Sequence, residues 1–141
     1  LMASRLLDVP TLVTEQNPNG LGSTVPELAT GHARTVFKDT FDACEEPGFM
    51  ELLPDAAKVI VVGCEAHVCV MQTALDLQRT GHHVFVVAEA VSSRDPESKR
   101  LALDRMRGQG IEIVNREMVG FEWLRRAGDD RFRGILKDFL R

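Results

Sequence analysis

Two short runs of apolar, mostly β-branched residues constrain this chain more than any other feature. They are "KVIVVG" at residues 58–63 and "HVFVVA" at residues 83–88. Almost continuous apolar runs are typical of strands that are covered on both faces, rather than strands that alternate between core and water. Strands of that kind belong to parallel sheets, so the two runs predict an α/β domain with a parallel sheet.

Helical patterns separate the candidate strands. From residue 68 onward, apolar side chains recur at spacings of three and four, and Gly81 ends the segment. Further strands are expected at residues 11–14, 34–37 and 111–114, and further helices at 49–53, 96–107, 116–128 and 132–140. The alternation predicts one three-layer, doubly wound domain with helices on both faces of the sheet. Ligands bind such sheets beyond the carboxyl ends of the strands.

Composition excludes several classes of function. The 141 residues are 44% hydrophobic and carry a net charge of −4, which suits one core and disfavours nucleic-acid binding. No apolar run reaches the roughly 18 residues of a membrane span, and the first residues do not resemble a signal peptide, so we expect a cytoplasmic protein. The 3 cysteines are too few for a disulfide framework and predict reduced thiols.

The hinge between residues 61 and 77, "VVGCEAHVCVMQTALDL", carries the candidate chemistry. Cys69 falls in the first turn of the expected helix, where unpaired N–H groups and the helix dipole stabilise a thiolate and can bind an oxyanion. Lys38, at the end of a neighbouring strand, is the preferred cationic partner. His67 lies two residues before Cys69 and would usually face elsewhere. A cysteine near a helix start can also be a small buried hydrophobe, so packing is the alternative role.

The other cysteines have simpler expected roles. Cys64 ends an apolar strand and is expected in the core, and Cys44 is expected to be inert in a loop. A redox pair of Cys64 and Cys69 remains a weaker alternative. Cys64, His67 and Cys69 could ligate a metal, but their spacing matches no common zinc pattern, so we expect no metal.

Glycine-rich segments give no sign of a cofactor. Gly20 and Gly22 in "NPNGLGST" lack the following Lys-Ser/Thr of a phosphate-binding loop, and we expect a shaped loop without a helix there. The segment "GCEAHV" lacks the glycines of a dinucleotide fingerprint, so no nicotinamide cofactor is expected.

Four segments in order carry a resemblance to a known family. They are "LLDVPTLVTEQNPNGLGSTVPEL" (6–28), "VFKDTFDAC" (36–44), "VVGCEAHVCVMQTALDL" (61–77) and "VFVVAEAVSSR" (84–94). Together they resemble the isochorismatase-like cysteine hydrolases, and in particular the isochorismatase-domain proteins. The resemblance implies a Rossmann-like sheet in the order 3-2-1-4-5-6 and a catalytic Asp, Lys and Cys. It places the nucleophile on Cys69 and the lysine on Lys38.

The same resemblance assigns the surroundings of the nucleophile. It implies a cis peptide between Cys64 and Glu65, and an oxyanion hole formed by the backbone N–H groups of Glu65 and Cys69. The ring of His67 is then available to line a pocket or a subunit contact. The residues Thr14, Glu15 and Gln16 follow the end of a strand and are further pocket-lining candidates.

The chain departs from the family pattern at two points. The catalytic Asp of the family ends the first strand, upstream of the residues present here, and Asp8 lies in a helix-to-strand connection at the wrong end of the next strand. We therefore expect residues 1–141 to form a single domain that lacks its first strand, or a variant without the acid/base. Relatives with nicotinamidase activity carry an Asp-x-His motif, but "TEQNPNGLG" contains no histidine, which again predicts no catalytic metal.

The resulting expectation is a hydrolase with a cysteine nucleophile that acts on a small molecule, with an amide-type C–N bond as the expected target. No cofactor, nucleic acid or membrane partner is expected, and the resemblance implies a homo-oligomer. The alternative is a non-catalytic binding or scaffold protein of the same fold, which a true absence of the Asp would favour.

Overall fold

The computed structural model of the chain describes residues 2–28 and 33–139. The chain divides into two compact units. We call Lys38–Asn115 the central unit, and the remainder, Leu1–Phe37 with Arg116–Arg141, the terminal unit. Each unit is described by itself.

The central unit is built on a parallel sheet of three strands in the order β3-β4-β5. The strands are β3 (Lys58–Cys64), β4 (His83–Ser92) and β5 (Glu112–Val114). Two of the pairs across the sheet are Val61 with Val86 and Val87 with Val114. Both predicted buried runs therefore form adjacent parallel strands, which confirms the α/β class predicted from them.

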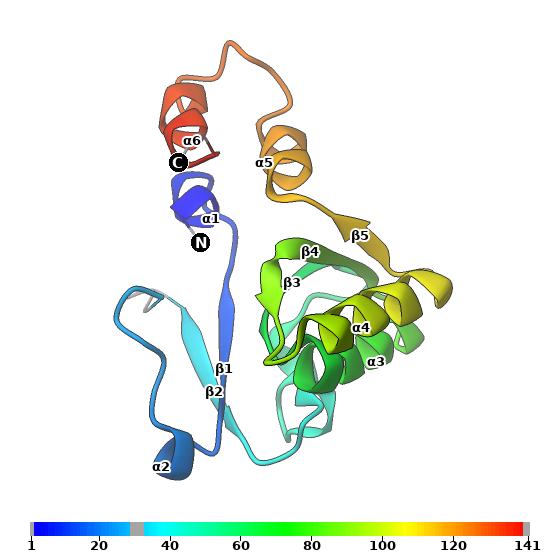
Figure 1. The fold of residues 1–141 in the computed structure, drawn as a ribbon. Coiled ribbons are helices and arrows are strands. Elements are labelled where there is room, and N and C mark those ends of the chain that lie inside the picture. Colours follow the sequence, from blue (N-terminus) through cyan, green and yellow to red (C-terminus); the bar gives the residue numbers. More distant parts are fainter. Residues whose placement is uncertain (1, 29–32, 140–141) are drawn as a thin grey trace. The chain divides into compact units, whose positions relative to one another are not determined.

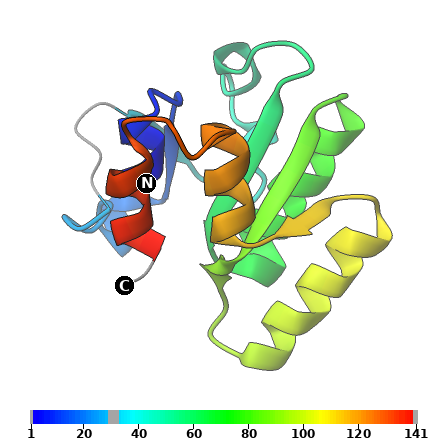
Figure 2. The ribbon, with the colours of Figure 1, turned by 90° about the horizontal axis from the view of Figure 1, so that it is seen from above.

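Two helices pack against this sheet and against each other, α3 (Met71–Arg79) and α4 (Pro96–Gly108). Figures 1 and 2 show them side by side along the sheet. Helix α4 begins where predicted because Asp95 caps it, accepting hydrogen bonds from the N–H groups of Glu97 and Ser98, and Pro96 occupies its first turn. Leu77, Val86 and Met106 are among the fully buried side chains of this core.

Strand β3 is less buried than its sequence predicted. Val59, Ile60 and Val61 are only partly buried, and Val62 is 44% exposed. The reason is topological: β3 lies at the end of the strand order of its sheet, whereas β4 lies between two strands. The four buried valines of β4 accordingly include Val86 and Val91.

Three short helical turns complete the central unit. They are the 3-10 turns η1 (Ala43–Glu45) and η2 (Met50–Leu52) and the π-helical turn η3 (Ala66–Val70), which leads directly into α3. The helix predicted at residues 49–53 is thus a 3-10 turn. The helix predicted to begin at residue 68 begins two residues earlier, as a π turn.

The described residues of the terminal unit form four helices and a two-stranded sheet, whose second strand ends at Lys38 of the central unit. The strands are β1 (Leu12–Gln16) and β2 (Arg34–Lys38), and the helices are α1 (Met2–Leu6), α2 (Pro18–Leu21), α5 (Arg116–Leu124) and α6 (Phe132–Phe139). Helix α6 packs on α1 and α5. Its Ile135 is fully buried and packs with Leu124, with Leu7 and Phe132 around them.

The segment with Gly20 and Gly22 corrects one prediction. A loop without a helix was expected there, but residues Pro18–Leu21 form one helical turn. Pro18 suits a first helical position, and Gly22 ends the turn with a φ of 84°, a value that glycine adopts without steric cost.

The pairing of strands agrees with the order implied by the resemblance. In the order 3-2-1-4-5-6, the strands numbered 2 and 3 are neighbours, and the strands numbered 4, 5 and 6 follow one another. The observed pairs are β1 with β2 and β3-β4-β5. Among the helices of residues 2–28 and 33–139, none combines the length and the apolar character needed to span a membrane.

Candidate active site

The hinge after β3 is where the chain reverses direction toward α3. Gly63 has a φ of 123°, which residues with a Cβ rarely adopt, and the peptide bond between Cys64 and Glu65 is cis. The cis peptide confirms the expectation drawn from the resemblance. The hinge lies at the carboxyl end of a parallel strand, where ligands bind in sheets of this kind.

The π turn changes the hydrogen bonding around Cys69. The carbonyl of Glu65 accepts hydrogen bonds from the N–H groups of Val68 (3.1 Å) and Val70 (3.2 Å). In a regular α-helix the partner of that carbonyl would be the N–H four residues further on, which is the N–H of Cys69. The π turn therefore shifts the hydrogen-bond ladder by one residue at the position of Cys69. Turns of this type occur frequently at functional sites.

Cys69 itself is the fourth residue of the helical segment and is half-buried. It was predicted in the first turn of a helix, and it lies in the π turn that precedes α3. Ala66 and Val70, on either side of it in the turn, are buried. The turn is thus anchored in the core while the thiol keeps partial access to solvent.

Lys38 is the last residue of β2 and the first of the central unit, the unit that also contains Cys69. Its side chain is buried, and its Nζ donates hydrogen bonds to the carbonyls of Thr40 (2.9 Å) and Phe41 (3.1 Å). The charge also contributes to lowering the pKa of Glu46, whose main cause is the backbone N–H of Thr40. A buried ammonium held by carbonyls is a fixed positive charge. Its pairing with Cys69 stays a prediction.

Glu65 and His67 belong to a network that reaches the end of β4. The carboxylate of Glu65 accepts a hydrogen bond from the N–H of Arg94 (3.0 Å), which is the main cause of the lowered pKa of Glu65. His67 Nδ1 lies 2.9 Å from the hydroxyl of Ser93. Sequence reasoning missed Ser93 and Arg94 because "SSRD" indicates only a turn and a helix cap. Their position after a neighbouring strand was the available signal.

The other two cysteines differ from Cys69 and from each other. Burial raises the pKa of the Cys44 thiol to about 12, and the nearby carboxylates of Asp42 and Asp76 add to the shift. Cys44 lies in the η1 turn rather than a loop, and its protonated thiol agrees with the predicted inertness. The prediction that Cys64 belongs to the core is wrong, because Cys64 is exposed at the last position of β3, beyond a register shift between Val61 and Gly63.

The pocket-lining candidates Thr14, Glu15 and Gln16 were expected to follow the end of a strand, but the strand is longer than predicted and they are the last three residues of β1, in the terminal unit. The carboxylate of Glu15 accepts a 2.7 Å hydrogen bond from the N–H of Thr24, and hydrogen bonds from Thr24 lower the pKa of Glu15. Their role as pocket-lining residues stays a prediction. Within the described part of the chain, no three His, Cys, Asp or Glu side chains are grouped so that they could hold a metal ion.

Comparisons with known proteins agree on one family. The model of the isochorismatase domain matches residues 1–118. Isochorismatase domain-containing protein 2 of Xenopus laevis is 37% identical over 139 residues, which are 97% of this chain and 68% of that protein. Among the curated relatives compared, the chain spans between 43% and 71% of their length.

Solved structures give the same result. The MAR1 ribonuclease from Caenorhabditis elegans has a TM-score of 0.88 and 37% identity, over 99% of this chain and 73% of that one. YcaC from Pseudomonas aeruginosa, solved with hexane-2,5-diol and covalent acrylamide, has a TM-score of 0.87 and 27% identity, over 95% of this chain and 70% of that one.

Proposed function

The chain belongs to the isochorismatase family of hydrolases, and from this membership we propose that it hydrolyses a small molecule with Cys69 as its nucleophile. The observation that carries the proposal is the hinge itself. A π turn follows the carboxyl end of β3, and Cys69, in that turn, is half-buried. The covalent acrylamide in the Pseudomonas aeruginosa relative supports a reactive group in a neighbour of this fold.

The proposed reaction is acyl transfer to Cys69 followed by hydrolysis. The thiolate attacks the carbonyl carbon of an amide-type bond, a C–S bond forms, and the electron pair of the C=O bond moves to oxygen. The backbone N–H groups of Glu65 and Cys69 stabilise that oxyanion. Its collapse breaks the C–N bond and releases the amine with a proton, and water then cleaves the thioester.

Lys38 supplies the positive charge of this site in the proposal. Its ammonium is fixed by the carbonyls of Thr40 and Phe41, so no reorganisation is needed for it to stabilise a nearby anion. We propose that this anion is the Cys69 thiolate. The catalytic aspartate that the resemblance implies stays a prediction. Its proposed role, to give the proton to the leaving amine, stays a prediction as well.

The remaining expectations about ligands and assembly are also proposals. Thr14, Glu15 and Gln16 of β1 are proposed as residues that contact the substrate, and so is His67. The residues 1–141 are proposed to belong to a single hydrolase domain that self-associates in the cytoplasm and takes neither a metal, an organic cofactor, nor a nucleic acid. RNA is not proposed as substrate, because acidic residues outnumber basic ones and the net charge is −4, which disfavours binding to phosphates.

Site-resolved thiol labelling tests the nucleophile. We expect iodoacetamide at pH 7 to label Cys69 at least about tenfold faster than the exposed Cys64, since the thiolate is the reactive form. Lys38→Met removes the charge while keeping most of the aliphatic stem, and should slow labelling of Cys69. Lys58→Met, at an exposed position, is the matched control and should leave the rate unchanged. Peptide mass spectrometry resolves the cysteines.

One result of the same experiment would overturn the proposal. If Cys69 reacts no faster than the exposed Cys64 in the folded protein, the hinge does not activate a thiolate. The non-catalytic binding or scaffold role of the same fold would then be the better account.

A further inference from the structure

Hydrogen bonds of Glu65 and His67 join the hinge to the segment that follows β4. The Oε2 atom of Glu65 accepts from the backbone N–H of Arg94 at 3.0 Å. Two residues further along the hinge, His67 Nδ1 lies 2.9 Å from Ser93 Oγ, and it also lies 3.7 Å from Glu65 Oε2. Neither contact is needed to form β3, β4 or α4, whose own hydrogen bonds are made elsewhere.

The sheet register explains why these residues meet. Cys64 pairs with Ser92 across the parallel strands β3 and β4, so the residues just beyond each strand end face one another. Glu65 and His67 flank Ala66, which is fully buried. The hinge is therefore held at three consecutive positions, by one packed methyl group and by two polar contacts to a single neighbouring segment.

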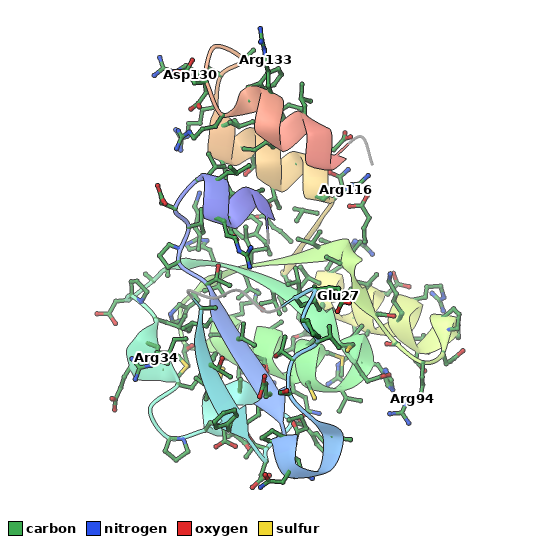
Figure 3. All side chains as sticks on the ribbon, turned by 90° about the vertical axis from the view of Figure 1, so that its left-hand side faces the viewer. Glu27, Arg34, Arg94, Arg116, Asp130 and Arg133 are labelled. Atoms are coloured by element: carbon green, nitrogen blue, oxygen red, sulfur yellow. The ribbon has the colours of Figure 1, made fainter. Side chains whose placement is uncertain are left out.

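The backbone N–H of Arg94 is the important part of the Glu65 contact. A carboxylate that accepts from a backbone N–H makes a charge-assisted hydrogen bond to a group that cannot move away. The Arg94 side chain, in contrast, is 79% exposed, with its Nε 3.4 Å from Glu65, and Figure 3 shows it projecting away from the ribbon. An exposed ion pair of that length adds little.

We propose that Glu65 and Ser93 are positioning residues, whose side chains hold the hinge so that its backbone N–H groups point at the oxyanion of the reaction. This inference rests on the proposed function, because Glu65 supplies one of the two proposed N–H donors. Preorganised donors must match the position of the developing charge, and a small displacement of them lowers the rate.

Two probes of Cys69 separate positioning from general damage. In the reaction with p-nitrophenyl acetate the thiolate forms a C–S bond to the acetyl carbon, and p-nitrophenolate leaves with its electron pair after a carbonyl oxyanion has formed. In the reaction with iodoacetamide the thiolate displaces iodide, and no carbonyl oxyanion forms. Only the first reaction depends on the oxyanion hole. Alkylation at Cys69 is measured in the full chain by fragment-ion mass spectrometry. Acetylation is measured as the release of p-nitrophenolate that Cys69→Ser loses, because water can cleave the acetyl thioester.

We expect Glu65→Ala to lower the acetylation rate of Cys69 about tenfold or more and to leave its alkylation rate within about twofold. Glu65→Gln retains an oxygen that can accept from Arg94 and should recover most of the acetylation rate. Ser93→Ala should show a smaller, selective loss. Arg94→Ala is the matched control, because it keeps the backbone N–H, and should stay within about threefold of wild type.

Each other outcome overturns a specific claim. Equal acetylation in wild type and Glu65→Ala overturns the positioning role and leaves the proposed function intact. A parallel loss of acetylation and alkylation means that Glu65 only stabilises the fold, which also overturns the positioning role. If Cys69→Ser releases p-nitrophenolate as fast as the wild type, the proposed function fails, and this inference fails with it.

Discussion

The three cysteines of the chain illustrate how the environment of a residue decides its chemistry. Cys64 is exposed at a strand end, Cys69 is half-buried in a π turn, and Cys44 lies in a 3-10 turn beside Asp42. From the residue type alone, each of the three could be either a small buried side chain or a reactive thiol. Only the position of Cys69, at the beginning of a helical segment, distinguishes it without a structure.

The raised pKa of Cys44 leads to the first residue-scale prediction. With a pKa of about 12, Cys44 is a thiolate in only about one molecule in ten thousand at pH 8. Iodoacetamide should therefore leave Cys44 unmodified in the folded protein and label it rapidly in urea, as measured by peptide mass spectrometry. Rapid labelling of Cys44 without denaturant would contradict the burial described here.

Asp42 leads to a prediction about stability and pH. Burial raises the pKa of Asp42, and the neighbouring Asp76 contributes through a hydrogen bond and its charge. A raised carboxyl pKa means that the folded state prefers the protonated form, so this group lowers stability as pH rises through the folded pKa. Asn at this position can still accept from the N–H of Cys44 and can always donate to Asp76.

Asp42→Asn should therefore be more stable than wild type at pH 7, and the difference should shrink toward pH 3. Urea denaturation at both values of pH measures it. A variant that is less stable than wild type at pH 7, or a difference that grows in acid, would show that the Asp42 carboxylate is stabilising.

At the scale of the elements, a hydrogen bond from a backbone N–H ties the η1 turn to α3. The backbone N–H of Ala43, a buried residue, donates to Thr73 Oγ1 at 3.0 Å. Thr73→Val keeps the shape of the side chain but leaves this buried N–H without its acceptor, which should cost about 1 to 3 kcal/mol of stability. Thr73→Ser keeps the hydroxyl and should cost less. Equal urea midpoints for the two variants would refute the role of the hydroxyl.

The packing of α3 and α4 gives a second prediction at this scale. Leu77 of α3 is 1% exposed, whereas Leu101 of α4 is 54% exposed. Leu77→Ala should cost about 3 kcal/mol, since it removes buried methyl groups and leaves a cavity. Leu101→Ala, the same substitution at a surface position, should stay within about 0.5 kcal/mol of wild type. Similar losses for both would mean that α3 does not bury the face described here.

The limits of sequence reasoning also appear at the level of elements. The apolar runs predicted β3 and β4, and Asp95 with Pro96 predicted the start of α4, because these signals are local. The π turn was not predicted, since a helical apolar pattern does not reveal a one-residue shift in the hydrogen-bond ladder. Strand β4 continues four residues beyond its apolar run, to Ser92, because its pairing with Cys64 extends it.

For the whole molecule, the strand pairs β1-β2 and β3-β4-β5 followed from the alternation of elements and the family order. The contacts of Glu65 with Arg94 and of His67 with Ser93 did not, because they join residues that are 29 and 26 positions apart. Such contacts depend on the register of two strands, which no local pattern specifies. Cys69 was predicted as nucleophile, and Lys38 as its cationic partner, from their positions at the start of a helix and the end of a strand. Their joint role remains a proposal.

Hydrolysis of small primary amides by the wild type and two cysteine variants tests the central claim most directly. Release of ammonia from a panel of such amides would be measured for wild type, Cys69→Ser and Cys64→Ser. The account predicts that Cys69→Ser loses at least about a hundredfold in rate, whereas Cys64→Ser, altered at the exposed cysteine, keeps most of it. Undiminished release by Cys69→Ser would contradict the assignment of the nucleophile.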